Sequence, residues 1–323
     1  MGEYTLKSTM APYIQGLLDQ KRALGYKYIT EEYVLRSFDE YWLRENGNLT
    51  ELTRESVEVW MQRKPTEGRT SRSGRISVLR QLAIFMNGIG HAAYIPDEKY
   101  VKDHPDIHVL STDEITELFS VVDNYRPKNN WPAAIRMSNE YKILFRLVLT
   151  TGLRRSEALQ IRIQDVDLNK GTVVIRGAKG HKDRLVYIAE DMLELLEEYL
   201  AYMSNIQDMS TVWLFPSLDT SRHMSEAVSV RFSQFWKETK YSGMCEKAPT
   251  LHSLRHTYVV IRMNQWMEAG VDLNVIMPYL SRQLGHTSIN ETFYYYHQVR
   301  EAFRIIQQRD TVAAKVIPGV RVR

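Results

Sequence analysis

The chain has 323 residues, 44% of them hydrophobic and 25% charged, which is typical of a globular protein long enough for two domains. The 42 lysines and arginines exceed the 39 aspartates and glutamates by only three, so net charge alone does not indicate a nucleic-acid partner. No apolar run is long enough for a membrane helix, no signal-peptide core is present, and the one cysteine, Cys245, excludes an internal disulfide or a cysteine-rich zinc module. We therefore expect a cytoplasmic protein with no membrane association and no role for Cys245.

Residues 1–95 predict a small helical domain. Apolar residues recur there at helical spacing, and glycine or proline follows the first and third segments. Thr30 and Thr53 are expected to cap the second and third helices. The four predicted helices span residues 6–24, 30–45, 53–64 and 71–89.

The connection between the third and fourth of these helices is basic. Six cations between Gln62 and Arg80 oppose Glu67 alone, which gives a local charge of +5. A solvated surface is the usual explanation of a charge run, but the glycine, serine and threonine residues around this one favour contact with DNA phosphates. The candidate DNA-binding residues are Arg63, Lys64, Arg69, Arg72, Arg75 and Arg80.

Residues 96–109 contain prolines and many charges without a sustained period, and they predict an interdomain linker. The second domain is expected to span residues 110–323, beginning with a helix that Ser111 caps. A β-hairpin with a glycine-containing tip is predicted from segments 171–176 and 184–188. The fold class is therefore mainly α with a small β-hairpin. The predicted helices of this domain span residues 114–123, 138–150, 153–160, 190–203, 225–239, 254–269, 274–283 and 288–307.

Arg154 follows a helix break at Gly152 and begins a short helix. A guanidinium at such a position can point outward beside free N–H groups and bind a phosphate, although most arginines at helix starts are surface residues. Glu157 lies one turn further on the same face. It could orient an arginine or a histidine, or form an ordinary surface pair.

A second group of candidate residues lies between positions 250 and 297. His252 and Arg255 share one helix face, so both can meet one phosphate. His252 and His256 have the spacing of a zinc-binding helix, but position 253 is serine rather than glutamate, which argues against a metal site. His286 follows a glycine at a helix end. Three tyrosines at 294–296 then occupy successive helix positions about 100° apart, so periodicity does not choose the one that faces the site.

The motifs TGLRRSE, AKGHKDR, LHSLRHT, LGHTSIN and YYYH occur in this order, and together they resemble the tyrosine recombinase family of phage-type integrases and Xer-like proteins. The resemblance covers residues 111–304 in motif detail. It implies a two-domain, C-shaped DNA clamp with a SAM-like core-binding domain at 1–95 and a catalytic domain at 110–323. It also implies a C-terminal exchange segment, 310–323, that docks into a neighbouring subunit. An ordinary frayed terminus is the alternative for this segment.

The resemblance further implies a mechanism. Tyr295, nine residues after His286, attacks the scissile phosphate and leaves a 3′-phosphotyrosyl link and a free 5′-hydroxyl. The arginines and imidazoles stabilise the developing charge without metal, ATP or any other cofactor. His252 helps remove the phenol proton, and Lys179, or the nearby Lys182, protonates the leaving oxygen. Glu157 holds the lysine–histidine network. The implied catalytic residues are Arg154, Glu157, Lys179, His252, Arg255, His286 and Tyr295.

The function implied is site-specific DNA recombination that serves integration, excision or transposition of a mobile element. The implied partner is double-stranded DNA with paired core sites, bound by a homotetramer in synapsis and by a nucleoid-associated monomer or dimer otherwise. An accessory recombinase or directionality factor is left open. Two alternatives are less favoured. A catalytically silent DNA-binding paralogue would not need the tyrosine and every charged position, and a metal-dependent phosphodiesterase would need a carboxylate cluster that is missing.

Overall fold

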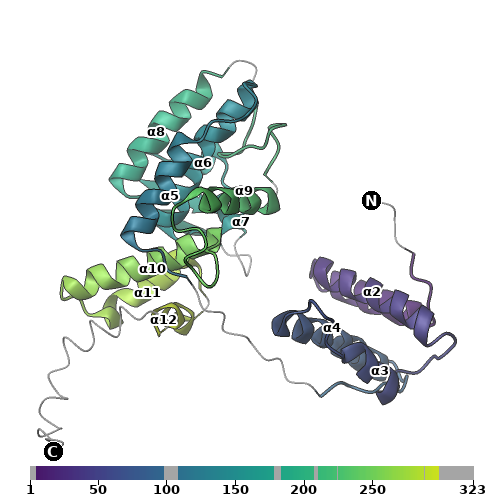
Figure 1. Ribbon diagram of the computed structural model, residues 1–323. Coiled ribbons are helices and arrows are strands. Elements are labelled where there is room, and N and C mark those ends of the chain that lie inside the picture. The colour runs from purple at the N-terminus through teal and green to yellow at the C-terminus, as the bar shows by residue number, and fades with distance from the viewer. Residues whose placement is uncertain are drawn as a thin grey trace, which may run out of the picture. The chain divides into compact units, whose positions relative to one another are not determined.

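The computed structural model describes residues 5–97, 108–177, 183–206, 210–223, 225–286 and 288–297. It divides the chain into two compact units, Met1–Pro105 and Asp106–Arg323. The division lies inside the linker predicted at residues 96–109. Both units are mainly helical, and the second holds one small sheet, in agreement with the predicted fold class (Figure 1). No helix among the described residues is long and apolar enough to cross a membrane.

The described part of the first unit, residues 5–97, forms four helices around an aromatic core. The ring of Phe38 contacts those of Trp42 and Trp60, with centroids 5.4 and 5.3 Å apart. Thr53 caps the third helix as predicted, because its side chain accepts a hydrogen bond from the Ser56 N–H. Thr30 is not a cap: the second helix begins one residue earlier, after a left-handed Tyr28. The helices are α1 (Ala11–Ala23), α2 (Ile29–Glu45), α3 (Arg54–Met61) and α4 (Arg69–Gly88).

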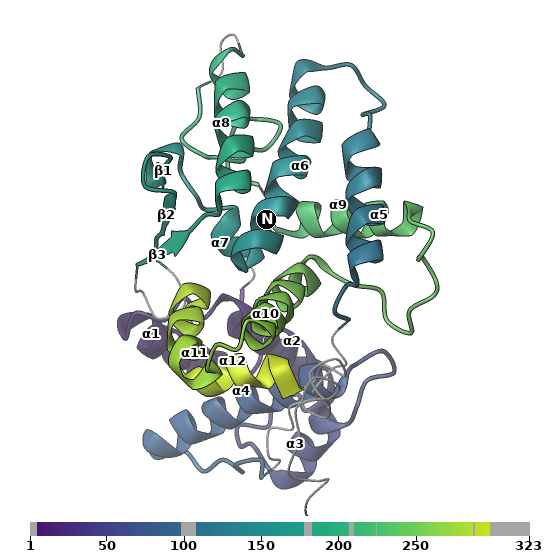
Figure 2. The same cartoon turned by 90° about the vertical axis from the view of Figure 1, so that its left-hand side faces the viewer.

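The second unit packs its helices around a larger core and places a three-stranded antiparallel sheet at its edge (Figure 2). The predicted hairpin is present in the register Val173 to Val186, and a short first strand, which the sequence did not indicate, extends it. The elements are α5 (Thr112–Asn124), α6 (Pro132–Thr151), α7 (Arg155–Ala158), a 3-10 turn (Ile163–Asp165), β1 (Val166–Asp167), β2 (Thr172–Ile175), β3 (Arg184–Tyr187), α8 (Glu190–Ser204), α9 (Ser225–Glu238), α10 (Leu251–Glu268), α11 (Leu273–Leu284) and α12 (Ile289–His297).

Helix α6 is the centre of this unit and packs against α5, α8 and α10. It begins at Pro132, six residues before the predicted start at 138, because proline at the first helical position is preorganised for the helix. Ser111 caps α5 in a complete capping box with Glu114, as predicted. A separate apolar cluster joins α10 and α11 and includes Tyr258, Met277 and Leu284. It holds the C-terminal end of α11 close to α10.

Candidate active site

The end of α6 sets the position of the first candidate residue. Gly152 ends the helix in a left-handed conformation, with φ of 68°, and the chain turns so that Arg154 precedes α7. A Cβ at position 152 would lie 2.5 Å from the Tyr258 ring and 2.7 Å from Leu284, both from the α10–α11 side. Glycine is therefore required here for its conformation and for the close approach of α6 to α10 and α11.

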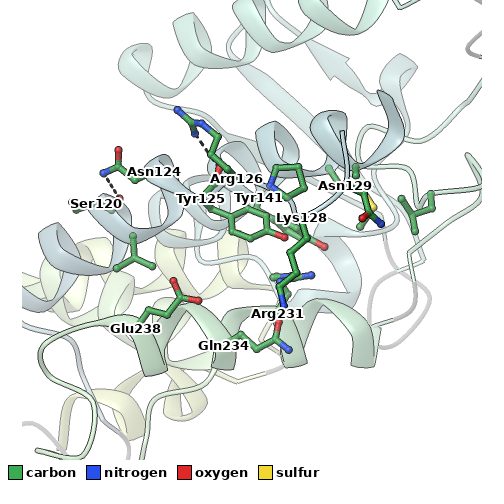
Figure 3. A pocket seen from close by; sticks show the side chains of 15 residues that line it. Ser120, Asn124, Tyr125, Arg126, Lys128, Asn129, Tyr141, Arg231, Gln234 and Glu238 are labelled. Atoms are coloured by element: carbon green, nitrogen blue, oxygen red, sulfur yellow. Dashed lines mark hydrogen bonds between the residues drawn. The ribbon is translucent and has the colours of Figure 1, made fainter. Parts of the chain in front are cut away.

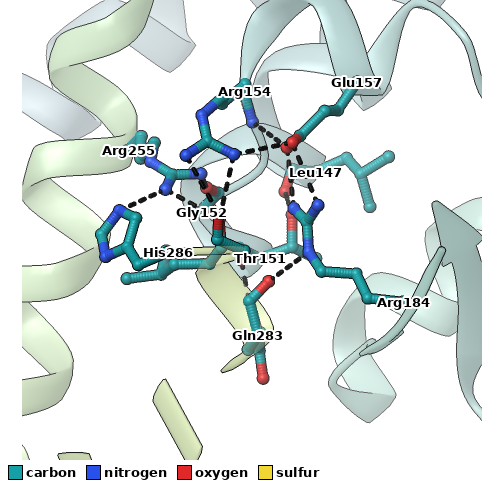
Figure 4. A network of polar contacts seen from close by, with 11 residues as sticks. Leu147, Thr151, Gly152, Arg154, Glu157, Arg184, Arg255, Gln283 and His286 are labelled. Atoms are coloured by element: carbon teal, nitrogen blue, oxygen red, sulfur yellow. Dashed lines mark hydrogen bonds and ion pairs between the residues drawn. The ribbon is translucent and has the colours of Figure 1, made fainter. Parts of the chain in front are cut away.

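A polar network joins α7, β3 and the end of α11 (Figure 4). The carboxylate of Glu157 accepts hydrogen bonds from the Arg154 guanidinium at 2.9 Å and from two nitrogens of Arg184 at 3.0 and 2.8 Å. Burial by itself raises the pKa of Glu157, but the Arg184 and Arg154 donors outweigh it and lower the pKa to about 2. Glu157 is therefore a fixed negative charge that orients two arginines.

The Arg154 fork does not project away from the protein as expected. Its Nη1 and Nη2 atoms lie 3.3 and 3.2 Å from the carbonyl oxygens of Leu284 and Gly285. Carbonyl groups at a helix C-terminus lack partners within the helix and carry partial negative charge, so they attract a cation. The side chain of Arg154 remains about one quarter exposed.

Arg255 is buried in the same network, with 0% of its surface exposed. It donates to the Gly152 carbonyl at 2.6 Å, to the Leu284 carbonyl at 2.9 Å and to Nε2 of His286 at 2.8 Å. A guanidinium has no acceptor, so Nε2 of His286 accepts, and Nδ1 carries the proton that is donated to Oγ1 of Thr292 at 2.7 Å. Burial and then Arg255 lower the pKa of His286 to about 4, which agrees with a neutral ring.

His252 and His256 contact each other edge to face on α10, with ring centroids 4.5 Å apart. Burial, followed by Arg255 and Arg154, lowers the pKa of His252 to about 4, although part of its surface remains open to solvent. Burial and then His252 lower the pKa of His256 to about 3. Within the described ranges, no third His, Cys, Asp or Glu ligand completes a metal-binding group with this pair.

The tyrosines at 294–296 lie on α12, which packs against α10 and α11. Thr292, the partner of His286, is on the same helix and fully buried. The side chain of Tyr295 falls outside the described residues. So do Lys179 and Lys182, the C-terminal segment 310–323, and the part of the last predicted helix beyond 297.

Sequence reasoning missed Arg184 and Gln283. Arg184 seemed only to start a strand, yet it binds Glu157 and donates from Nε to the Gln283 carbonyl at 2.8 Å. Gln283 donates in turn to the Tyr258 hydroxyl at 2.7 Å. The sequence feature that could have indicated Arg184 was its position at the start of a predicted strand, beside a glycine-containing tip. The described hydrogen-bond partners of Glu157 are arginines. Its expected contact with the lysine involves residues outside the described ranges and stays a prediction.

The sequence pattern of the phage integrase family matches residues 108–302, which is more than half of the chain. The chain belongs to the phage integrase family. This confirms the tyrosine recombinase class that the five motifs predicted.

Relatives of this integrase-family chain are recombinases from archaea and bacteria. A probable integrase/recombinase of Methanocaldococcus jannaschii is 33% identical over 162 residues, 50% of this chain and 46% of that protein. Tyrosine recombinase XerD of Rickettsia conorii is 24% identical over 306 residues, 89% of this chain and 93% of that protein. The chain therefore spans about half the length of the first relative and nearly all of the second.

Solved structures of the family share the fold. The XerH site-specific recombinase bound to palindromic difH substrate, a post-cleavage complex, has a TM-score of 0.62 and 19% identity, and the match covers 89% of this chain and 78% of that one. The Tn1549 transposon integrase in complex with a circular intermediate DNA has a TM-score of 0.66 and 14% identity, and the match covers 92% and 99%. At these identities the likeness is one of fold.

The six cations predicted to bind DNA have different environments in this integrase-family chain. Arg75 is only 6% exposed, forms a buried ion pair with Glu67 at 2.7 Å and donates to the backbone carbonyls of Trp60 and Gln62. Its charge is paired with that of Glu67 and it holds the α3–α4 connection in place, while its predicted contact with DNA stays a prediction. Arg72 and Arg80 also donate to backbone carbonyls and are half-buried. The exposed members are Arg63, Lys64 and Arg69.

A cavity of about 970 Å³ lies between α5, α6 and α9 (Figure 3). Arg231 lies over the Tyr125 ring there, 5.0 Å from its centroid, and Tyr141 forms part of the wall. The cavity shares no residue with the network around Glu157 and Arg255. It is therefore not the reaction centre that the family's motifs predict.

Proposed function

We propose that this tyrosine recombinase cleaves and rejoins DNA strands at specific sites, with Tyr295 as nucleophile and a 3′-phosphotyrosyl intermediate. The observation that carries the proposal is the convergence of Arg154, Arg255 and His286 at the C-terminal end of α11. Two guanidiniums and one imidazole from three separate motifs meet there, immediately before the helix that holds Tyr295.

The arginine donors supply the electrostatic part of the reaction. Attack on the scissile phosphate increases negative charge on its non-bridging oxygens, and preorganised donors that face this charge lower the barrier. The Leu284 carbonyl lies 2.9 Å from Arg255, the length of a charge-assisted hydrogen bond, whereas the contacts of Arg154 with the Leu284 and Gly285 carbonyls are longer, at 3.3 and 3.2 Å. We infer that a bound phosphate replaces part of these carbonyl contacts, because an anion competes well for a guanidinium.

The lowered pKa values of His252 and His286 support the roles proposed for them. Tyrosine loses its proton near pH 10, so attack at neutral pH requires a base or a cationic field. The lowered pKa of His252 keeps its ring neutral at pH 7, so a ring nitrogen can accept a hydrogen bond from the phenol, and the guanidiniums supply the cationic field that helps the proton leave. His286 is also neutral, and its contacts with Arg255 and Thr292 fix the orientation of its ring. It can therefore act as a hydrogen-bond donor through Nδ1 or as a positioning group. Lys179, or the nearby Lys182, both between β2 and β3 in the sequence, would protonate the leaving 5′-oxygen.

The position of Tyr295 on α12 supports its selection. Thr292 contacts His286, and residues three and four positions later share its side of a helix. Positions 295 and 296 meet this condition and position 294 does not. The family spacing of nine residues after the histidine then selects Tyr295 over Tyr296.

A nicked suicide substrate tests the function. Synthetic duplexes from the two ends of the element that carries the gene are nicked next to the cleavage point, and protein is added with EDTA. A covalent protein–DNA adduct that survives detergent is expected, and Tyr295→Phe should abolish it. Tyr294→Phe is the matched control and should retain it. An adduct lost in Tyr296→Phe but kept in Tyr295→Phe would refute the assignment of the nucleophile.

Tight binding without an adduct would indicate a silent DNA-binding paralogue, and EDTA-sensitive cleavage without an adduct would indicate a metal-dependent phosphodiesterase.

The assembly on DNA is part of the same proposal. One solved relative is a lambda integrase tetramer bound to a Holliday junction, and another is a dimer bound to a core site. We infer that this recombinase binds paired core sites as a homotetramer, that segment 310–323 exchanges between subunits, and that the protein acts at the nucleoid. Mass measurement on DNA carrying two core sites should detect four protomers, and truncation at 309 should reduce the complex to smaller species.

A further inference from the structure

Three side chains of different chemistry meet at the beginning of the second unit. Nε2 of His108 lies 2.9 Å from Oε1 of Glu114, and the Cys245 sulfur lies 3.8 Å from each of these atoms. The histidine precedes α5, the glutamate is in its first turn, and the cysteine is in the 239–250 connection between α9 and α10. Sequence alone gave Cys245 no role, because its partners lie more than 130 positions away.

We propose that His108, Glu114 and Cys245 bind one divalent transition-metal ion, of the class of Zn²⁺, with water as the fourth ligand. Ligands at about 2.0–2.3 Å from a tetrahedral zinc lie roughly 3.3–3.6 Å from one another. The three distances here bracket that range, so small shifts would place an ion between the atoms. Thiolate, imidazole and carboxylate together select zinc or cobalt over magnesium or calcium, which prefer oxygen ligands.

The surroundings hold two of these ligands in position. Oε2 of Glu114 accepts a hydrogen bond from the Ser111 N–H at 2.8 Å as part of the capping box, which leaves Oε1 directed at His108. The His108 ring lies edge-on to Trp236, with centroids 6.0 Å apart. Groups of this kind around a metal site orient the ligands and raise the affinity.

The proposed ion would have a structural effect rather than a chemical one. It shares no residue with the network around Arg255, and it would join the start of the second unit to the segment that leads into α10. Two residues after His108, the Leu110 N–H already donates to Oγ1 of Thr257 on α10, two positions from Arg255. A metal ion would strengthen this connection between the domain's first residues and the helix that carries His252 and Arg255.

A cobalt titration tests the site. The full chain is reduced, freed of metal with a chelator, and titrated with Co²⁺. One equivalent should produce a thiolate-to-cobalt charge-transfer absorption that Zn²⁺ then displaces. Cys245→Ser should abolish the absorption, and His108→Gln should weaken binding at least tenfold. His252→Gln should retain it, and this variant controls for an ion held by the His252–His256 pair.

The result is independent of the DNA reaction, since the absorption is measured without DNA. Absence of a charge-transfer band at stoichiometric Co²⁺ would overturn the proposal and leave an ordinary His108–Glu114 ion pair beside a thiol. A band that persists in Cys245→Ser would also overturn it. Circular dichroism of each variant establishes that it is folded, and the double variant His108→Gln/Cys245→Ser should show no increase in melting temperature with Zn²⁺.

Discussion

Arg154 and Arg255 donate to the same carbonyl oxygen, that of Leu284, at 3.3 and 2.9 Å. The two arginines belong to motifs about 100 residues apart, and they meet because Gly152 lets the end of α6 approach α10 and α11. Arg184 adds a third guanidinium, and the Glu157 carboxylate binds both Arg184 and Arg154 (Figure 4). A DNA phosphate bound beside these guanidiniums would add a negative charge that they attract.

Replacement of either arginine by lysine should slow strand cleavage more than it weakens DNA binding. Lysine retains the charge but lacks the planar fork that can bind two acceptors at once. We expect Arg154→Lys and Arg255→Lys each to reduce the single-turnover rate of adduct formation by about 10²–10³-fold. Arg155→Lys is the matched control, because Arg155 is the next residue and contacts Ser229 instead. A loss of affinity as large as the loss of rate would contradict a role in the transition state.

Substitution of Glu157 by glutamine should show a defined pH dependence. Its folded pKa of about 2 lies below the usual 4.5, so its stabilising effect is complete above pH 4.5 and is lost as pH falls toward 2. At neutral pH, Glu157→Gln should lower the free energy of unfolding by up to about 3 kcal/mol. The difference from wild type should narrow below pH 4.5 in urea titrations. Exposed Glu197→Gln should stay within about 0.5 kcal/mol of wild type at neutral pH. A difference that does not change with pH would refute the ionic origin.

Local patterns in the sequence predicted most of the helices and the positions of the site's chemical groups. Gly152 marks the end of α6 and Gly285 the end of α11, because a left-handed residue after a helix is usually glycine. His286 follows Gly285 directly and Arg154 comes two residues after Gly152, so their placement at helix ends could be predicted from neighbours in the chain. The order of the five motifs, and the family that this order resembles, then indicated that these residues form one active site.

Contacts between distant segments could not be predicted in the same way. Nothing near Arg184 indicates that it will pair with Glu157, 27 positions earlier. Arg75 looks like its basic neighbours in sequence, and its burial depends on how α3 and α4 place Trp60 and Glu67 around it. The periodicity of a helix shows which residues share a face, but not which other segment covers that face.

Alanine at position 152 should destabilise the second unit more than alanine at another left-handed glycine. Both Gly152 and Gly270 have positive φ, which costs a residue with a Cβ about 1–2 kcal/mol. Only position 152 adds contacts of 2.5–2.7 Å with Tyr258 and Leu284, worth roughly a further 1–3 kcal/mol of overpacking. Differential scanning calorimetry should therefore show a clearly larger decrease in melting temperature for Gly152→Ala than for Gly270→Ala. Equal decreases would show that the packing can adjust at no cost.

Alanine substitution of Arg75 should lower the stability of the first unit, whereas alanine substitution of Arg69 should weaken DNA binding. Arg75→Ala leaves Glu67 buried without its partner, which should lower the stability of the first unit by about 3–5 kcal/mol. Arg69 is exposed at the first position of α4, where free N–H groups already favour an anion. Arg69→Ala should leave the melting temperature unchanged, weaken DNA binding at every sequence, and reduce the slope of log affinity against log salt by about one. Binding is measured by fluorescence anisotropy at several salt concentrations, below the melting temperature of each variant. An unchanged salt slope in Arg69→Ala would remove this residue from the DNA interface, and a fully stable Arg75→Ala would show that the buried ion pair does not hold the connection.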